Sequence, residues 1–134
     1  MNRVLASVTA PVLIYIFLVI YGVIVYTINS LELPPIFSLA EFLTIYLISF
    51  AFCFFIGIPL SFIIDKIKGI RGINYTLAGG IIYVILMIKN NIEHSRFFIH
   101  VDSLLTYSFA GLAFFISLKI MEILFQKLSV RYSK

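Results

Sequence analysis

Four long runs of apolar residues, separated by short polar connections, make up most of this 134-residue chain. The runs lie at about residues 8–28, 42–64, 72–88 and 103–125, and only the last contains charged side chains. A helix needs about 20 apolar residues to cross a hydrocarbon core of about 30 Å, and it satisfies its own backbone hydrogen bonds there. The pattern therefore predicts an all-α integral membrane protein with four spans.

The composition agrees with this class. Hydrophobic residues make up 62% of the chain and charged residues 12%, whereas a soluble domain carries about 25% charged residues. The first apolar run is too long for a secretory signal, and no small-residue cleavage site follows it. We expect this first span to be retained in the protein.

Basic residues are concentrated on alternate connections. Seven of them lie before the first span, in the inner loop 65–71 and in the tail 126–134, whereas the outer loops 29–41 and 89–102 contain only Lys89 and Arg96. Short basic loops resist translocation, so the basic side is cytoplasmic. The prediction is a single membrane domain, residues 1–134, folded as an antiparallel up-down four-helix bundle. It would lie in the bacterial cytoplasmic membrane with both termini inside.

In this topology the net charge of +4 can be explained without a nucleic-acid partner. Basic residues at the cytoplasmic face meet anionic lipid headgroups, each contributing about 1 kcal/mol near the surface. Nucleic-acid binding requires a basic patch on a folded surface, which the short loop 65–71 does not offer. The lipid bilayer is therefore the first expected partner.

Two residues of the second run indicate local structure. Pro59 removes a backbone hydrogen bond and clashes with the carbonyl four residues earlier, which predicts a kink near Phe55. The kink is interpreted as a fixed bend, with a hinge as the alternative. Cys53, the only cysteine, has no partner for a disulfide and is interpreted as a small packing residue.

Small residues recur on one face of the third run and again in the fourth. Such faces let membrane helices approach closely. We expect the two runs to form a tight contact through Gly72, Thr76, Gly79, Gly80, Ala110, Gly111, Ala113 and Ser117.

Lys119 and Glu122 are the charged residues of the fourth run and lie three positions apart, so their side chains can form an ion pair on one helical face. At about 1.5 Å per residue, Lys119 lies roughly 24 Å from the outer edge. That depth is close to the inner boundary, where a long side chain can reach the headgroups. The pair is interpreted as an interfacial anchor.

The outer loop 89–102 contains the residues with metal-ligand chemistry. If the loop is extended, His94, His100 and Asp102 share one face and could bind zinc. Their spacing matches no metal-binding motif, so we interpret them as polar surface and expect no metal.

No cofactor or enzyme motif is present in the sequence: it has no phosphate-binding glycine loop and no nucleophile elbow. We therefore expect a protein that is not an enzyme and has no cofactor.

The segment Gly57-Ile58-Pro59-Leu60-Ser61-Phe62-Ile63-Ile64-Asp65-Lys66, with its basic turn and the glycine-containing span after it, resembles a pattern in small uncharacterised four-span membrane proteins of bacilli and related Gram-positive bacteria. The similarity extends to Lys119-Ile120-Met121-Glu122-Ile123-Leu124. The resemblance implies a cytoplasmic-membrane protein and carries over no catalytic residue.

Two classes of function remain. The first is an interaction protein, either an accessory subunit or an immunity-type protein, that binds a membrane protein partner or itself through helix faces. The second is a small oligomeric transporter or channel. The first is preferred because transport usually requires charged groups within the membrane, and the first three spans have none.

Overall fold

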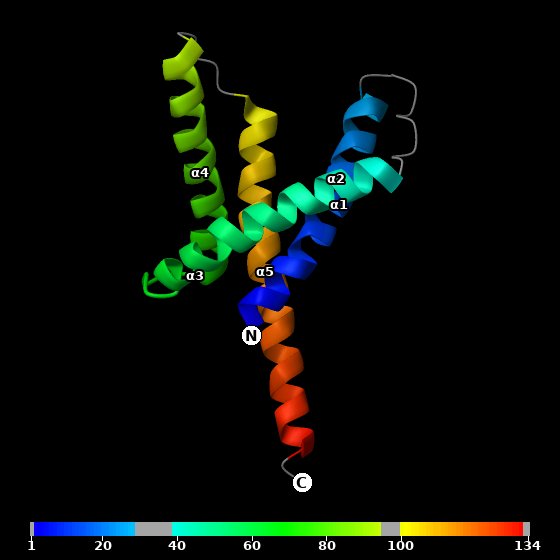
Figure 1. The fold of residues 1–134 in the computed structure, drawn as a ribbon, viewed down its shortest axis with the longest axis vertical. Coiled ribbons are helices and arrows are strands. Elements are labelled where there is room, and N and C mark those ends of the chain that lie inside the picture. The colour runs from blue at the N-terminus through cyan, green and yellow to red at the C-terminus, as the bar shows by residue number, and fades with distance from the viewer. Residues whose placement is uncertain (1, 29–38, 95–99, 133–134) are drawn as a thin grey trace.

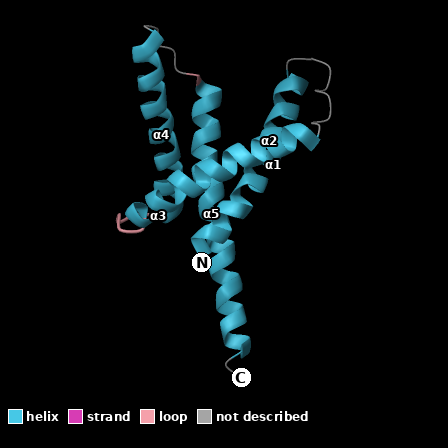
Figure 2. Cartoon of the chain, viewed as in Figure 1, coloured by secondary structure: helices cyan, strands magenta, loops and turns pink. Residues whose placement is uncertain are grey.

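The computed structural model describes residues 2–28, 39–94 and 100–132. Almost all of these residues are helical, residues 65–70 form a turn, and none of the described residues forms a strand (Figure 2). The helices are α1 (Asn2–Ile28), α2 (Leu39–Phe52), the π-helix η1 (Cys53–Gly57), α3 (Ile58–Ile64), α4 (Arg71–His94) and α5 (Val101–Tyr132). Since α2, η1 and α3 follow one another without a break, they form one helical rod from Leu39 to Ile64.

Four helical segments are long and apolar enough to cross a membrane: Asn2–Ile28, Leu39–Ile64, Arg71–Lys89 and Val101–Lys127. The prediction of an all-helical chain with four segments of spanning length is therefore confirmed. Each predicted span lies within one of these segments.

The helices extend beyond the predicted spans into the outer loop 89–102 and into the tail 126–134. α4 continues to His94, so the first part of the outer loop 89–102 is helical and not extended. α5 continues to Tyr132 and includes most of the tail 126–134. Polar residues mark the end of a membrane-spanning segment, but the helix can continue through them because its backbone hydrogen bonds also form in water.

Helix α5 lies at the centre of the molecule (Figure 1). α4 lies beside it, α1 packs against it from another side, and the α2–η1–α3 rod crosses the other helices at a steep angle. The last turns of α5 project beyond the rest of the protein.

The contact between α1 and α5 is made by small side chains. Ala6 and Ala10 on α1 are completely buried, as is Ala113 on α5, and all three belong to one core cluster. Farther along, the rings of Phe17 and Phe109 stack with their centroids 3.8 Å apart. Small residues bring the two backbones close, which gives the van der Waals contact on which helix association in membranes depends.

Helices α4 and α5 approach through two glycines. A Cβ atom on Gly79 would lie 2.1 Å from the carbonyl oxygen of Tyr107, and one on Gly111 would lie 2.1 Å from the carbonyl oxygen of Tyr75. These distances are far below van der Waals contact, so only glycine fits at either position.

The π-helix η1 lies immediately before Pro59. Its wider turn is closed by the N–H of Ile58, which donates to the carbonyl of Cys53. Proline has no N–H and its ring clashes with the carbonyl four residues earlier, here that of Phe55. The distortion thus lies in the turn that contains Phe55, and single π turns of this kind are frequent at functional sites.

Candidate functional site

Five charged residues from three helices and one turn meet at one end of the bundle. This charged cluster consists of Arg3 on α1, Asp65 after α3, Arg71 at the start of α4, and Lys119 and Glu122 on α5. The cluster joins residues from the beginning, the middle and the last quarter of the chain, so it exists only in the folded protein.

Asp65 is the centre of the cluster. One carboxylate oxygen accepts a 2.7 Å hydrogen bond from Arg3, and the other accepts bonds from Arg71 at 2.7 and 3.1 Å and from the Tyr75 hydroxyl at 3.3 Å. Its side chain is 19% exposed. Burial by itself would raise the pKa of this carboxyl, but the hydrogen bonds and charges of Arg71 and Arg3 outweigh burial and hold the pKa below its ordinary value.

The local chain path brings these groups together. Asp65 follows the last residue of α3, and its N–H still donates to the carbonyl of Ser61. The turn then passes through Gly69, whose φ of +138° suits glycine, and α4 begins at Arg71. Arg3 reaches the turn from α1 with its guanidinium carbon 3.6 Å from the centre of the Phe62 ring, a cation–π contact.

The second half of the cluster joins α5 to α4. Lys119 and Glu122 form an ion pair at 2.9 Å, three residues apart on one face of α5. The other oxygen of Glu122 lies 3.8 Å from Arg71. Arg71 therefore links the Asp65 and Glu122 carboxylates, and the pair on α5 is one end of a larger network.

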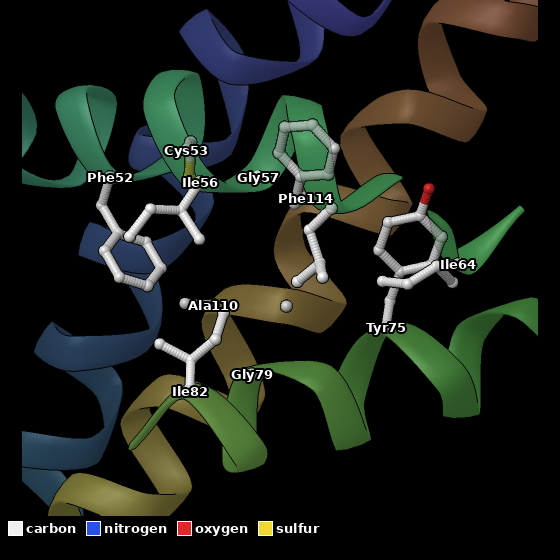
Figure 3. Close-up of a pocket in the computed structure, with 12 residues that line it drawn as sticks. Phe52, Cys53, Ile56, Gly57, Ile64, Tyr75, Gly79, Ile82, Ala110 and Phe114 are labelled. Atoms are coloured by element: carbon white, nitrogen blue, oxygen red, sulfur yellow. The ribbon is translucent and has the colours of Figure 1, made fainter. Parts of the chain in front are cut away.

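An apolar cavity lies deeper in the bundle, between the π-helix and the α4–α5 contact (Figure 3). Its volume is about 30 Å³, and its lining includes Cys53, Gly57, Gly79 and Phe114. A water molecule needs several polar partners in addition to space. A cavity of about 30 Å³ is too small for an organic substrate.

The Phe114 ring fills the space beside the π-helix (Figure 3). A Cβ on Gly57 would lie 3.2 Å from this ring, and one on Gly72 would lie 3.2 Å from the ring of Phe115. Gly57 and Gly72 therefore leave room for aromatic side chains of α5.

The remaining small residues proposed for helix packing have different surroundings. Ala110 and Ser117 on α5 are buried, and the Ser117 hydroxyl has no hydrogen-bond partner among the described residues. The Thr76 hydroxyl donates to the carbonyl of Gly72, and Thr76 and Gly80 line a groove on the outside of the α4–α5 pair.

The opposite end of the bundle is held by hydrogen bonds, with no ion pair among the described residues. The Tyr21 hydroxyl of α1 donates to the Asp102 carboxylate at the start of α5. The backbone N–H of His100 donates to the hydroxyl of Tyr83 on α4 at 2.9 Å. These bonds fasten α5 to α1 and α4 at this end.

The described residues contain no group of three side chains able to hold a metal ion. Asp102 is bonded to Tyr21, and His94 lies in the last turn of α4, where its side chain falls outside the described residues. The arrangement with His94, His100 and Asp102 on one extended face does not apply, because residues 89–94 are helical.

Sequence reasoning missed the centre of the cluster. Arg3 and Arg71 were considered only as orientation signals, although Asp65 is the single acidic residue in the basic loop 65–71 and was available as their partner. The close face of α1 was also missed, although Ala6 and Ala10 have the four-residue spacing of a packing face.

Comparisons of the chain with known protein families, with curated proteins and with solved structures find no match. Its function must therefore be inferred from its own geometry: the charged cluster, the apolar interior and the exposed helix faces.

Proposed function

We propose that this chain is a four-span protein of the bacterial cytoplasmic membrane, with an up-down topology and both termini in the cytoplasm. The charged cluster supports this orientation. It joins the first turn of α1, the α3–α4 turn and the inner part of α5 at one end, which is also the end richest in basic residues. Basic loops remain cytoplasmic.

The protein acts by binding another membrane protein, as an accessory subunit or an immunity-type protein, and it is not an enzyme. The contact surface is the exposed face of the second span. We call this surface the α2 face, and it consists of Thr44, Leu47, Ile48, Ala51 and Phe55.

The observation that carries this proposal is the absence of any buried residue in α2. α2 packs on α1, through contacts such as the Tyr46 hydroxyl donating to the carbonyl of Val8, and leaves its other side open. Leu47 is 62% exposed and Ile48 is 67% exposed. A span that its own bundle covers so little has room for a second helix.

The α2 face also has small residues that would allow a helix of a partner protein to pack closely. Thr44 and Ala51 are small residues two turns apart on the same side, and the Thr44 hydroxyl is satisfied by the carbonyl of Ala40. Small residues allow the close approach that stabilises helix pairs in lipid. The glycines of α4 and α5 are already used within the chain, because Gly79 and Gly111 contact backbone.

A transporter or channel is the alternative. Transport of charged species usually requires ionisable groups inside the membrane. The charged groups described here lie at the two ends of the bundle, and the interior cavity is apolar. This distribution favours binding over transport.

Crosslinking in native membranes followed by mass spectrometry tests the proposal. With a photoreactive residue at Ile48, we expect crosslinks to one other membrane protein, and we expect Ala51→Phe to abolish them by blocking close approach. Gly22→Phe is the matched control, because no atom lies within 4 Å of a Cβ built on Gly22. Crosslinks to lipid or to a second copy alone would overturn the accessory-subunit role.

Transport is tested separately in vesicles containing the purified protein. Ion flux that disappears in the Lys119→Gln, Glu122→Gln double variant would favour the alternative. Reporter tags after Pro35 and after Asn91 test the topology, and both should be accessible only from outside the cell.

A further inference from the structure

The α3–α4 turn, residues 65–70, has a surface that the partner-binding proposal does not use. Lys66 and Lys68 are exposed, and neither is paired with a carboxylate among the described residues. The other cations nearby are engaged: Arg3 and Arg71 bind Asp65, and Lys119 binds Glu122. The turn therefore presents two uncompensated positive charges.

Isoleucines alternate with these lysines. Ile67 is 52% exposed and Ile70 is 69% exposed, and both lie in the turn outside the spanning helices. Exposure of two large aliphatic side chains to water is unfavourable, at about 25 cal/mol for each Å² of apolar surface. Apolar side chains beside lysines are instead typical of segments that lie in the headgroup layer of a membrane.

The turn is held in a fixed position relative to the bundle. Asp65 is bonded to Arg3 and Arg71, and the backbone of the turn is closed by bonds from Lys66 N–H to the Ile63 carbonyl and from Ile67 N–H to the Ile64 carbonyl. Bonds to α1, α3 and α4 therefore determine where Lys66 and Lys68 lie. A surface fixed in this way loses little conformational entropy when it binds a ligand.

We propose that this turn is a binding site for the headgroup of an anionic phospholipid, with Lys66 and Lys68 contacting the phosphate and Ile67 and Ile70 inserted beside the acyl chains. The occupant is identified by charge complementarity and by the exposed isoleucines, since a dissolved phosphate would use only the lysines. The inference does not depend on the partner of the α2 face.

The test is native mass spectrometry of the purified full-length protein, titrated with phosphatidylglycerol or with phosphatidylcholine. We expect phosphatidylglycerol to be retained in preference. Each lysine near the surface contributes about 1 kcal/mol, which corresponds to about fivefold in affinity. Lys66→Gln and Lys68→Gln should each weaken retention by about fivefold, and the double variant by about 25-fold.

Lys89→Gln is the matched control, because Lys89 is an exposed lysine at the opposite end of α4. It should leave retention unchanged. Ile67→Ser with Ile70→Ser should reduce retention while keeping the preference for the anionic lipid. Equal retention of the two lipids, or an equal effect of Lys89→Gln, would overturn the proposal. Displacement of the lipid by millimolar inorganic phosphate would also overturn it, since the site would then bind dissolved anions.

Discussion

The Arg3 guanidinium and the Asp65 carboxylate lie 2.7 Å apart, although 62 residues separate them in the chain. This bond ties the first turn of α1 to the turn between α3 and α4. Because Asp65 also binds Arg71, one carboxylate connects three helices at the same end of the bundle. Side-chain bonds thereby join these helices at this end of the bundle.

The first prediction concerns this bond. Asp65→Asn should lower the free energy of unfolding in detergent by about 1–2 kcal/mol, between the values for exposed and for buried ion pairs, because Arg3 and Arg71 lose their anionic partner. In a double-mutant cycle, Arg3→Gln and Asp65→Asn should couple by about 1 kcal/mol.

Asp102→Asn provides the control for this cycle. Asp102 lies at the other end of the bundle, bonded to Tyr21, so its substitution should show no coupling with Arg3→Gln. Additive effects of Arg3→Gln and Asp65→Asn would show that the 2.7 Å contact makes no specific contribution to stability.

The second prediction is the pH dependence of the same site. The pKa of Asp65 lies below its ordinary value of 3.8 in the folded protein. A carboxyl with a lowered pKa adds stability that is present in full above its unfolded pKa and is lost as the pH falls through its folded pKa. The difference in melting temperature between the native protein and Asp65→Asn should therefore be constant near neutral pH and shrink only below about pH 4.

Thermal unfolding followed by circular dichroism, from neutral pH down to about pH 2, measures this difference. Other carboxylates titrate in the same range, but they contribute equally to both proteins and cancel. A difference that begins to shrink near neutral pH would mean that the Asp65 carboxyl has a raised pKa and not a lowered one.

The third prediction concerns the close contact of α4 and α5. Gly79→Ala should destabilise the protein by about 3 kcal/mol, at the upper end of the range for overpacking, because the added Cβ meets backbone that cannot rotate away. Gly111→Ala should have a similar effect, as its Cβ would also lie 2.1 Å from a carbonyl oxygen.

Gly22→Ala is the matched substitution in open space. No atom lies within 4 Å of its added Cβ, so this variant should unfold like the native protein or be slightly more stable, since alanine favours helix more than glycine. Unfolding measured by intrinsic tyrosine fluorescence is sufficient to rank the three variants. Equal stability of Gly22→Ala and Gly79→Ala would contradict the close backbone contact.

Some features of this fold can be predicted from the sequence, and others depend on how the helices pack. Apolar runs of spanning length predict four helices because the bilayer imposes both length and backbone hydrogen bonding. The ion pair of Arg3 with Asp65 could not be predicted in the same way, since it depends on which helix ends converge. Similarly, Pro59 indicates a disturbed helix, but not that the chain responds with a π turn at Cys53–Gly57.

The same distinction applies to the two candidate surfaces, the α3–α4 turn and the α2 face. A lysine-rich turn is visible in the sequence. Only the folded cluster shows that Arg71 is engaged by Asp65 while Lys66 and Lys68 have no carboxylate partner within the described part of the chain. The exposure of α2 also depends on the steep crossing of the second span over the other helices (Figure 1). Hydropathy alone gives no crossing angle, because all sides of such a span are apolar.

The last prediction separates packing from partner binding within one helix. Cys53 is buried beside a cavity of about 30 Å³, whereas Ala51, two residues earlier, is exposed. Cys53→Phe adds more atoms than the cavity can accept and should lower the free energy of unfolding by about 1–3 kcal/mol. Ala51→Phe should leave unfolding unchanged and yet abolish crosslinking from the α2 face. If both variants unfolded like the native protein, the tight packing around the π-helix would be refuted. If Ala51→Phe were the destabilised variant, the α2 face would be a buried surface of this chain and could not be the site where a partner binds.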